Sequence, residues 1–292
     1  MHRIAQQRCR EFFYHLEAQQ MNLKTIEKKI DWQHWMERWD AQQSYHLPVR
    51  EERFQIMLST IETLCPADSV VLDLACGPGS ISQRLLSKLP QSQAIAADYD
   101  PVLLKLGKEA LGDAQGRLHW LKVDLNDPQW TVKIQEVLKS IGRNSLDAVL
   151  SSTALHWLTT PRLIDVYRQI SQLLRPGGLL LNADHMAFNP TLPTFLSLAQ
   201  QDKDQRKKLL SRQQQSEDFG QWWQAIESNW LSIDSSLQAL FDEHNNNYEV
   251  RDRRYGKALA SLHISALADA GFIEVETIWQ RFDNRIMLAV NG

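Results

Sequence analysis

The sequence predicts a doubly wound α/β fold with a seven-stranded, mainly parallel sheet that ends in an antiparallel hairpin. Five short apolar segments alternate with helix-like segments between residues 69 and 184, which is the pattern of parallel strands joined by crossover helices. Near the end of the chain, residues 272–279 and 285–290 form two further strand-like segments. The turn between them is short and contains Asp283 and Asn284, so we expect these two strands to pair as a hairpin.

Each element is predicted from the spacing of its apolar residues. Strands are expected where a short run is mostly apolar, and helices where apolar residues recur every three or four positions. The last helix is expected to end before Gly271, because glycine commonly follows a helix C-terminus. The five parallel strands are expected at residues 69–74, 93–98, 118–123, 146–151 and 179–184, and the helices of the core at 80–89, 101–111, 131–141, 161–174 and 257–270.

Two additions to this core are expected to be helical. Residues 1–66 are predicted to form an N-terminal helical segment, or lid, in which Pro48 interrupts the helical spacing. Residues 67–292 are predicted to form the α/β domain. A helical insertion is placed within it at about 186–256, because this stretch is long, polar and rich in glutamine. Its basic run at 203–212 is interpreted as a solvated helix face.

Composition limits the class of protein. The 292 residues are 43% hydrophobic, which allows a sizeable core, and their net charge of −3 does not favour binding to nucleic-acid phosphates. Cys9, Cys65 and Cys76 lack metal-binding spacing, and free thiols are typical of the reducing cytoplasm. The first ten residues do not resemble a signal peptide, and no apolar run has the roughly 20 residues of a membrane span. We expect a cytoplasmic monomer or homodimer with no nucleic-acid partner, no metal site and no membrane span.

The clearest chemical signal is the segment VVLDLACGPGS, residues 70–80. It predicts a buried strand, a turn without bulky side chains and the start of a helix. Gly77 and Gly79 allow the backbone to approach a ligand closely, and the helix N-terminus presents unpaired N–H groups. Taken alone, the turn indicates a nucleotide site of some kind. With Ser82 in the last position, it differs by one residue from the dinucleotide fingerprint GxGxxG.

The charge of Asp73 favours one cofactor over another. This carboxylate stands at the end of the strand, where it would repel the pyrophosphate of a dinucleotide. S-adenosylmethionine carries a sulfonium and an ammonium group, and attraction between unit charges about 4 Å apart is worth about 4 kcal/mol at an effective dielectric near 20. The alternative interpretation is that Asp73 is a structural cap on the turn.

Two more acids end the next two predicted strands. Asp98 can accept hydrogen bonds from both hydroxyls of a ribose, and Tyr99 beside it could pack on adenine. Asp124 ends the third strand and could accept a hydrogen bond from the adenine amino group. Because the carboxyl ends of parallel strands share one edge of the sheet, the three acids are expected to face one ligand there.

These segments resemble the motifs of the class I S-adenosylmethionine-dependent methyltransferases, especially small-molecule enzymes of the trans-aconitate and biotin-pathway type. Residues 71–79 are similar to the first motif, although Ala75 replaces its first glycine. LDAVLSS at 146–152 resembles the fourth-strand motif, and LRPGG at 174–178 the loop before the fifth strand. The resemblance covers roughly residues 65–185 and 257–290. It implies that the cofactor is held by Asp73, Ala75, Gly77, Gly79, Asp98, Tyr99, Asp124, Leu125 and Ser151.

Candidate catalytic residues are two histidines. His156 follows the fourth strand, in a stretch that in similar methyltransferases lies beside the methyl donor. It could act as a general base, orient the substrate or simply pack beside Trp157. His185, at the end of the fifth strand, is a second candidate. Arg50 and Arg53 are candidates for binding the cofactor carboxylate, with a surface role as the alternative.

The resemblance implies methyl transfer to O, N or C of a small-molecule metabolite by direct displacement. The aromatic residues of the two additions favour an apolar or planar acceptor, unless they only fasten the extra helices to the core. Alternatives are a non-catalytic S-adenosylmethionine-binding protein and an NAD-type oxidoreductase, with an RNA or protein methyltransferase less favoured. The aromatic residues concerned are Trp32, Trp35, Trp39, Tyr45, Trp222, Trp223 and Trp230.

Overall fold

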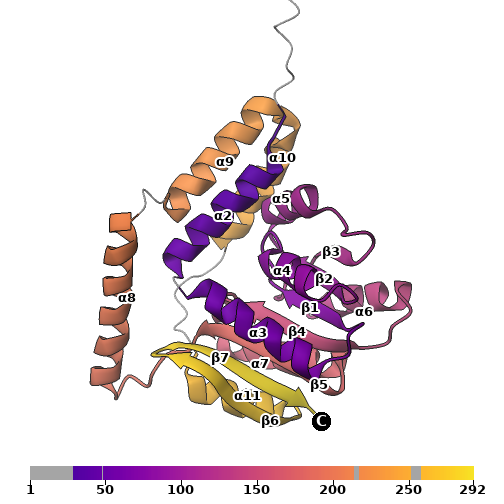
Figure 1. Cartoon of the computed structure of the whole chain (residues 1–292), viewed down its shortest axis with the longest axis vertical. Coiled ribbons are helices and arrows are strands. Elements are labelled where there is room, and N and C mark those ends of the chain that lie inside the picture. The colour runs from indigo at the N-terminus through magenta and orange to yellow at the C-terminus, as the bar shows by residue number, and fades with distance from the viewer. Residues whose placement is uncertain (1–28, 48, 214–216, 251–257) are drawn as a thin grey trace, which may run out of the picture.

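The computed structural model describes residues 29–47, 49–213, 217–250 and 258–292. Its centre is a seven-stranded sheet with the order β3-β2-β1-β4-β5-β7-β6 (Figure 1). The first five strands are parallel, and β7 runs antiparallel to both β5 and β6. This confirms the predicted doubly wound fold and its closing hairpin. The strands are β1 (Val70–Leu74), β2 (Gln93–Asp98), β3 (Leu118–Lys122), β4 (Leu146–Ser152), β5 (Leu174–His185), β6 (Phe272–Arg281) and β7 (Asn284–Asn291).

The strand order determines where a ligand can bind. The chain first winds outward from β1 through β2 to β3, and then returns to the other side of β1 with β4 and β5. The order therefore reverses between β1 and β4. In open α/β sheets, ligands bind at such a reversal, beyond the carboxyl ends of the strands.

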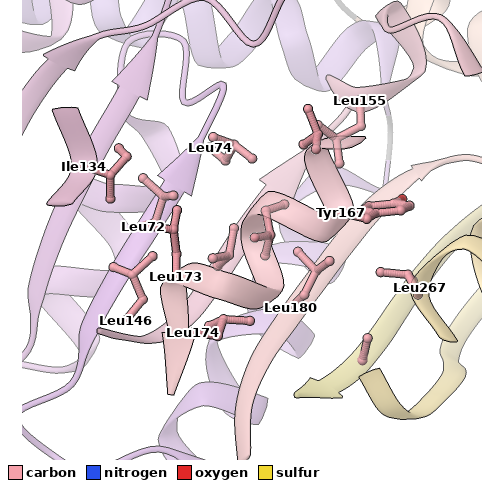
Figure 2. Close-up of a cluster of buried hydrophobic side chains, with 14 of the residues drawn as sticks. Leu72, Leu74, Ile134, Leu146, Leu155, Tyr167, Leu173, Leu174, Leu180 and Leu267 are labelled. Carbon is pink, nitrogen blue, oxygen red and sulfur yellow. The ribbon is translucent and has the colours of Figure 1, made fainter. Parts of the chain in front are cut away.

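Both faces of the sheet are covered by helices, as the alternation of side chains along the strands requires. Leu72 and Leu74 point to the face covered by α6, α7 and α11, where they belong to the same buried cluster as Tyr167 and Leu173 of α7 (Figure 2). Val71 points to the opposite face, which packs against α3 and α4. The helices are α3 (Arg50–Leu64), α4 (Ser80–Lys88), α5 (Pro101–Leu111), α6 (Trp130–Ser140), α7 (Thr160–Leu173) and α11 (Ala260–Asp269).

Parts of the two predicted additions form a cap together, with α2 from the first and α9 and α10 from the second. The N-terminal helix α2 packs against α9 of the insertion and against α5, and α10 also packs against α5 (Figure 1). Trp222 and Trp230 are fully buried in the resulting cluster with Trp35 and Phe241, so these tryptophans fasten the added helices to the core. Helix α8 lies at the edge of this group, where it contacts α2 (Figure 1). The elements are α2 (Trp32–His46), α8 (Pro193–Gln213), α9 (Phe219–Ile233), η2 (Ser235–Leu237) and α10 (Gln238–Val250).

The predicted boundaries differ from the structure in one informative place. The segment 174–178, expected as a loop before the fifth strand, is part of β5. Leu174 pairs with Leu146, and the register then shifts before Leu179 pairs with Ala148. The Pro-Gly-Gly stretch therefore makes a bulge within the strand, as glycines in strands often do. Residues 1–28, including Cys9, and residue 257 lie outside the described part of the chain.

A buried network of hydrogen bonds joins α7, α11 and β5. The Tyr167 hydroxyl on α7 lies 2.6 Å from Nδ1 of His263 on α11, and it accepts a hydrogen bond of 3.1 Å from the side-chain amide of Asn182 on β5. Burial lowers the pKa of His263 to about 4. The imidazole is therefore neutral near pH 7, and its Nδ1 can accept the hydrogen bond from the Tyr167 hydroxyl.

In the described residues, no helix has both the length and the apolar character needed to cross a membrane.

We predict that Tyr167→Phe lowers the free energy of unfolding by about 1–3 kcal/mol, because it leaves buried groups of His263 and Asn182 without their partner. Urea unfolding followed by circular dichroism measures this loss. Tyr45→Phe, on a half-buried tyrosine of α2, is the matched control and should change stability by less than about 0.5 kcal/mol. Equal effects of the two substitutions would contradict the importance of the network.

Candidate active site

A cavity of about 480 Å³ lies where the strand order reverses. Its floor is formed by the segments that follow β1, β2 and β4, and its roof by side chains of the cap. The floor contributes Asp73, Ala75, Gly77, Asp98, Tyr99 and His156, and the roof Trp39, Gln43, Phe219, Trp223 and His244.

The turn after β1 has an unusual backbone. Ala75 and Gly77 both have φ of +57°, and Gly79 has φ of +83°. This is the left-handed region, which glycine enters freely and alanine enters at a cost. A Cβ atom on Gly79 would also lie 2.6 Å from the Trp120 ring, so the close packing of this turn on β3 requires a glycine. Ala75, which the sequence showed in place of a glycine, therefore adopts a conformation that its side chain disfavours.

Asp73 has a structural role as well as a place at the cavity. One of its carboxylate oxygens accepts hydrogen bonds from the backbone N–H and the hydroxyl of Ser82, at 3.1 and 2.8 Å. Ser82 lies in the first turn of α4, so Asp73 caps that helix. Burial raises the pKa of Asp73 to about 7. The two interpretations of this residue are therefore compatible, because a single carboxylate caps the helix and lines the cavity.

Asp98 holds the other side of the same turn. Its carboxylate accepts backbone hydrogen bonds of 2.8 Å from both Gly77 and Asp100. Burial raises the pKa of Asp98 to about 6. Tyr99 and Leu125 also line the cavity. Three residues predicted to hold the cofactor, which come at or after the ends of the second and third strands, therefore lie around one space.

His156 lies in the short helix η1 (Leu155–Trp157) after β4 and lines the cavity. Its Nδ1 is 2.7 Å from one oxygen of Asp184, and its backbone N–H donates to the other oxygen at 3.0 Å. Burial alone would raise the pKa of Asp184, but the neighbouring His156 and Arg53 hold it well below its ordinary value. Sequence reasoning missed Asp184. Its position at the end of a predicted strand was the available signal, but the pairing with His156 is visible only in three dimensions.

Arg53 is buried behind the site rather than exposed in it. Its guanidinium donates to the side chains of Asn284 and Ser152, at 3.0 and 2.8 Å, and to the carbonyl oxygen of Ala183. Burial lowers the pKa of Arg53 to about 10, which leaves it cationic near pH 7. The other arginine candidate, Arg50, does line the cavity.

Arg50 also fastens the cap to the core. Its Nη1 lies 2.8 Å from Asp40 on α2, and its guanidinium stacks over the ring of Phe54 at 4.6 Å. Asp40 in turn accepts a hydrogen bond of 2.7 Å from Ser80 and pairs with Arg84 on α4 at 3.0 Å. This network places α2 directly above the glycine-rich turn.

Several predicted site residues lie outside the cavity wall. Ser151 is buried and donates to the Leu74 carbonyl at 3.0 Å, while its neighbour Ser152 lines the cavity. His185 is 3.4 Å from Asp283 at a smaller pocket. The residues not brought to the main cavity are Arg53, Gly79, Asp124, Ser151 and His185. Within the described ranges, no group of three or more His, Cys, Asp or Glu side chains could hold a metal ion.

Comparison with known proteins shows which protein family the central part of the chain resembles. A family model described as a methyltransferase domain matches residues 71–178, the segment that contains the glycine-rich turn, Asp98 and His156. These residues are similar to a methyltransferase domain, and we refer to them by that name. Trans-aconitate 2-methyltransferase of Azoarcus sp. (strain BH72) is 26% identical over 147 residues, which are 50% of this chain and 50% of that protein. Malonyl-[acyl-carrier protein] O-methyltransferase of Hahella chejuensis is 28% identical over 133 residues, 46% of this chain and 42% of that protein.

The solved structures extend the likeness in fold. An O-methyltransferase family protein from Burkholderia thailandensis superposes with a TM-score of 0.51 at 17% identity, covering 92% of this chain and 66% of that one. At this identity, the likeness concerns the fold alone. The chain spans about half the length of the curated relatives it matches.

We predict that Ala75→Gly raises the free energy of unfolding of the methyltransferase domain by about 1 kcal/mol, because glycine adopts φ of +57° without the steric cost that alanine bears. Thermal and urea unfolding measure the gain. Ala154→Gly is a matched control, since Ala154 also lines the cavity but has φ of −131°. That substitution should lower stability through the added freedom of the unfolded chain. A loss of stability in Ala75→Gly would show that the turn is not strained.

Proposed function

We propose that this protein transfers a methyl group from S-adenosylmethionine to a small molecule by direct displacement. The observation that carries the proposal is the meeting of Asp73, Asp98 and His156 at one cavity on the carboxyl edge of the sheet. When bound, the cofactor supplies a methyl group already activated by the sulfonium. The chain's own residues need only bind and orient the reactants, exclude water and accept a proton where the acceptor loses one.

The donor set at the cavity suits this cofactor. Asp98 is proposed to accept hydrogen bonds from the ribose hydroxyls, and Tyr99 and Leu125 to contact adenine, because all three line the cavity. The buried carboxylate of Asp73 favours a cationic ligand nearby. The guanidinium of Arg50, at the same wall, suits the carboxylate of the amino-acid end. We keep Asp124 as a candidate for the adenine amino group, and leave Arg53 out of the cofactor set because its donors are used behind the site.

The geometry of the first turn of α4 disfavours an NAD-type site. In dinucleotide sites the pyrophosphate accepts hydrogen bonds from the helix N-terminus. Here a backbone N–H of that turn, from Ser82, already donates to the carboxylate of Asp73. A pyrophosphate would meet the negative charge of Asp73 at the place where it needs free backbone N–H donors. The sulfonium and ammonium groups of S-adenosylmethionine would be attracted by the same charge.

The acceptor is proposed to be an apolar or planar small molecule that loses a proton. Trp39, Phe219, Trp223 and Trp157 give the cavity an aromatic wall, which favours flat and apolar ligands. The curated relatives named above are a trans-aconitate and a malonyl-[acyl-carrier protein] methyltransferase, so acceptors with a reactive oxygen are the first to test.

His156 is proposed as the general base. The bond between its Nδ1 and Asp184 places the proton on that nitrogen and leaves Nε2 as the proton acceptor. The negative charge of Asp184 also stabilises the imidazolium that forms. His185, the second histidine predicted from the sequence, belongs to another pocket and has no part in this proposal.

The cofactor assignment predicts a mutational and a pH effect. Asp98→Asn should weaken S-adenosylhomocysteine binding by about tenfold or more, since hydrogen bonds to a charged acceptor are lost. In the unaltered protein, Asp73 and Asp98 gain protons as the pH falls through 7 and 6. Affinity should therefore fall by about 100-fold between pH 8 and pH 5.5, because binding must expel both protons. Calorimetric titration measures both effects.

Asp113→Asn, on an exposed acid beyond the sheet, is the control for this titration and should leave the affinity unchanged. If the unaltered protein bound NAD but neither S-adenosylmethionine nor S-adenosylhomocysteine, the proposed function would be wrong. A pH-independent affinity would remove Asp73 and Asp98 from the site.

The proposed base predicts a separate effect on turnover. With an acceptor found by screening planar hydroxyl compounds, which lose a proton on methylation, His156→Ala should lower kcat by about 100-fold to 10,000-fold. Affinity for S-adenosylhomocysteine should stay within a few fold, because the base does not hold the cofactor. His185→Ala is the matched control and should keep full turnover. Unchanged kcat in His156→Ala would leave this residue a packing role only.

A further inference from the structure

The helical insertion contributes two adjacent aromatic side chains to the cavity. Trp223 on α9 and His244 on α10 both line it. Their rings are stacked, with centroids 3.9 Å apart and planes inclined by 22°. They come from helices that are separate in the chain, so this surface exists only when the cap is assembled.

The His244 ring is held in place by the core. Its Nδ1 lies 2.7 Å from Oδ2 of Asp100, and both side chains are buried. The other oxygen of Asp100 accepts hydrogen bonds from the backbone N–H groups of Val102 and Leu103, at 3.0 and 3.1 Å, and so caps α5. These hydrogen bonds fix the orientation of Asp100. Asp100 in turn fixes the orientation of the His244 ring, on which Trp223 stacks.

The stacked pair lies beside the proposed ribose acid. Asp98 and Asp100 are two residues apart, which limits the distance between their Cα atoms to about 7 Å. The Asp100 backbone N–H also donates to the Asp98 carboxylate at 2.8 Å. A ligand whose hydroxyls reach Asp98 therefore has its neighbouring ring close to Asp100, Tyr99 and the cap.

We propose that the insertion completes the cofactor site, with Trp223 and His244 covering the adenosine end of the ligand. This inference rests on the proposed function and extends it to a part of the chain outside the methyltransferase domain. A purine is a flat aromatic ring that packs favourably on other aromatic rings, and the stacked pair presents such a surface next to the carboxylate that suits a ribose. The cap is then a part of the cofactor pocket as well as a wall of the acceptor pocket.

His244→Gln and Trp223→Leu test this role. Glutamine can still donate a hydrogen bond to Asp100, so His244→Gln removes the ring without leaving that buried carboxylate unpaired. Each substitution should weaken binding of S-adenosylhomocysteine by about tenfold. Adenosine alone should lose affinity by the same factor, because the contacts concern only that end of the ligand. Calorimetry measures both, without any acceptor present.

Glu243→Gln is the matched control on the same helix. Glu243 is adjacent to His244 in sequence, forms an exposed ion pair with Lys122 and is absent from the cavity wall, so its loss should leave affinity unchanged. Circular dichroism and the unfolding temperature establish that the variants are folded. If folded His244→Gln and Trp223→Leu both bind S-adenosylhomocysteine as tightly as the unaltered protein, the inference is overturned. If the unaltered protein itself fails to bind, the proposed function fails instead.

Discussion

The site depends on the two hydrogen bonds that Ser82 donates to the Asp73 carboxylate. They join the end of β1 to the first turn of α4 and enclose the turn between them. Asp98 closes the turn from the other side by accepting the Gly77 N–H. Both carboxylates are buried at the same cavity and have raised pKa values. The acids that shape the turn are therefore also those that give the cavity its charge.

The cap is joined to this centre by charge and by aromatic packing. Asp40 on α2 pairs with Arg50 on α3 and accepts a hydrogen bond from Ser80 on α4, beside the turn. On the opposite side, tryptophans of α2 and α9 pack on Leu106 of α5, the helix that follows Asp98. Movement of the cap relative to the sheet would therefore disturb both flanks of the cavity. The roof and the floor are parts of one packed unit, although the roof comes from two segments far apart in the chain.

The fold was predictable because it depends on local patterns. Apolar strands, helical spacing and the Asp283-Asn284 turn each lie within one short segment, and the strand acids Asp73 and Asp98 are located by the strand ends. Contacts between distant segments were not predictable. Asp184 meets His156 across 28 residues, and His244 meets Asp100 across 144 residues. No spacing rule relates such pairs. The position of Arg53 was not predictable for a related reason, since the sequence of a helix does not reveal whether an arginine faces the ligand or the rear of the site.

The antiparallel hairpin has a consequence for the chemistry of the site. Pairing of β7 with β5 places Asn284 opposite His185, at the carboxyl end of β5. Arg53 reaches this point from α3, where it donates to Asn284 and to the carbonyl of Ala183. The next residue, Asp184, receives the attraction of that buried cation and remains ionised. His156 has the larger effect on the pKa of Asp184, and the charge of Arg53 lowers this pKa further against the cost of burial. The reversed last strand thus helps to fix the charge on which the proposed base depends.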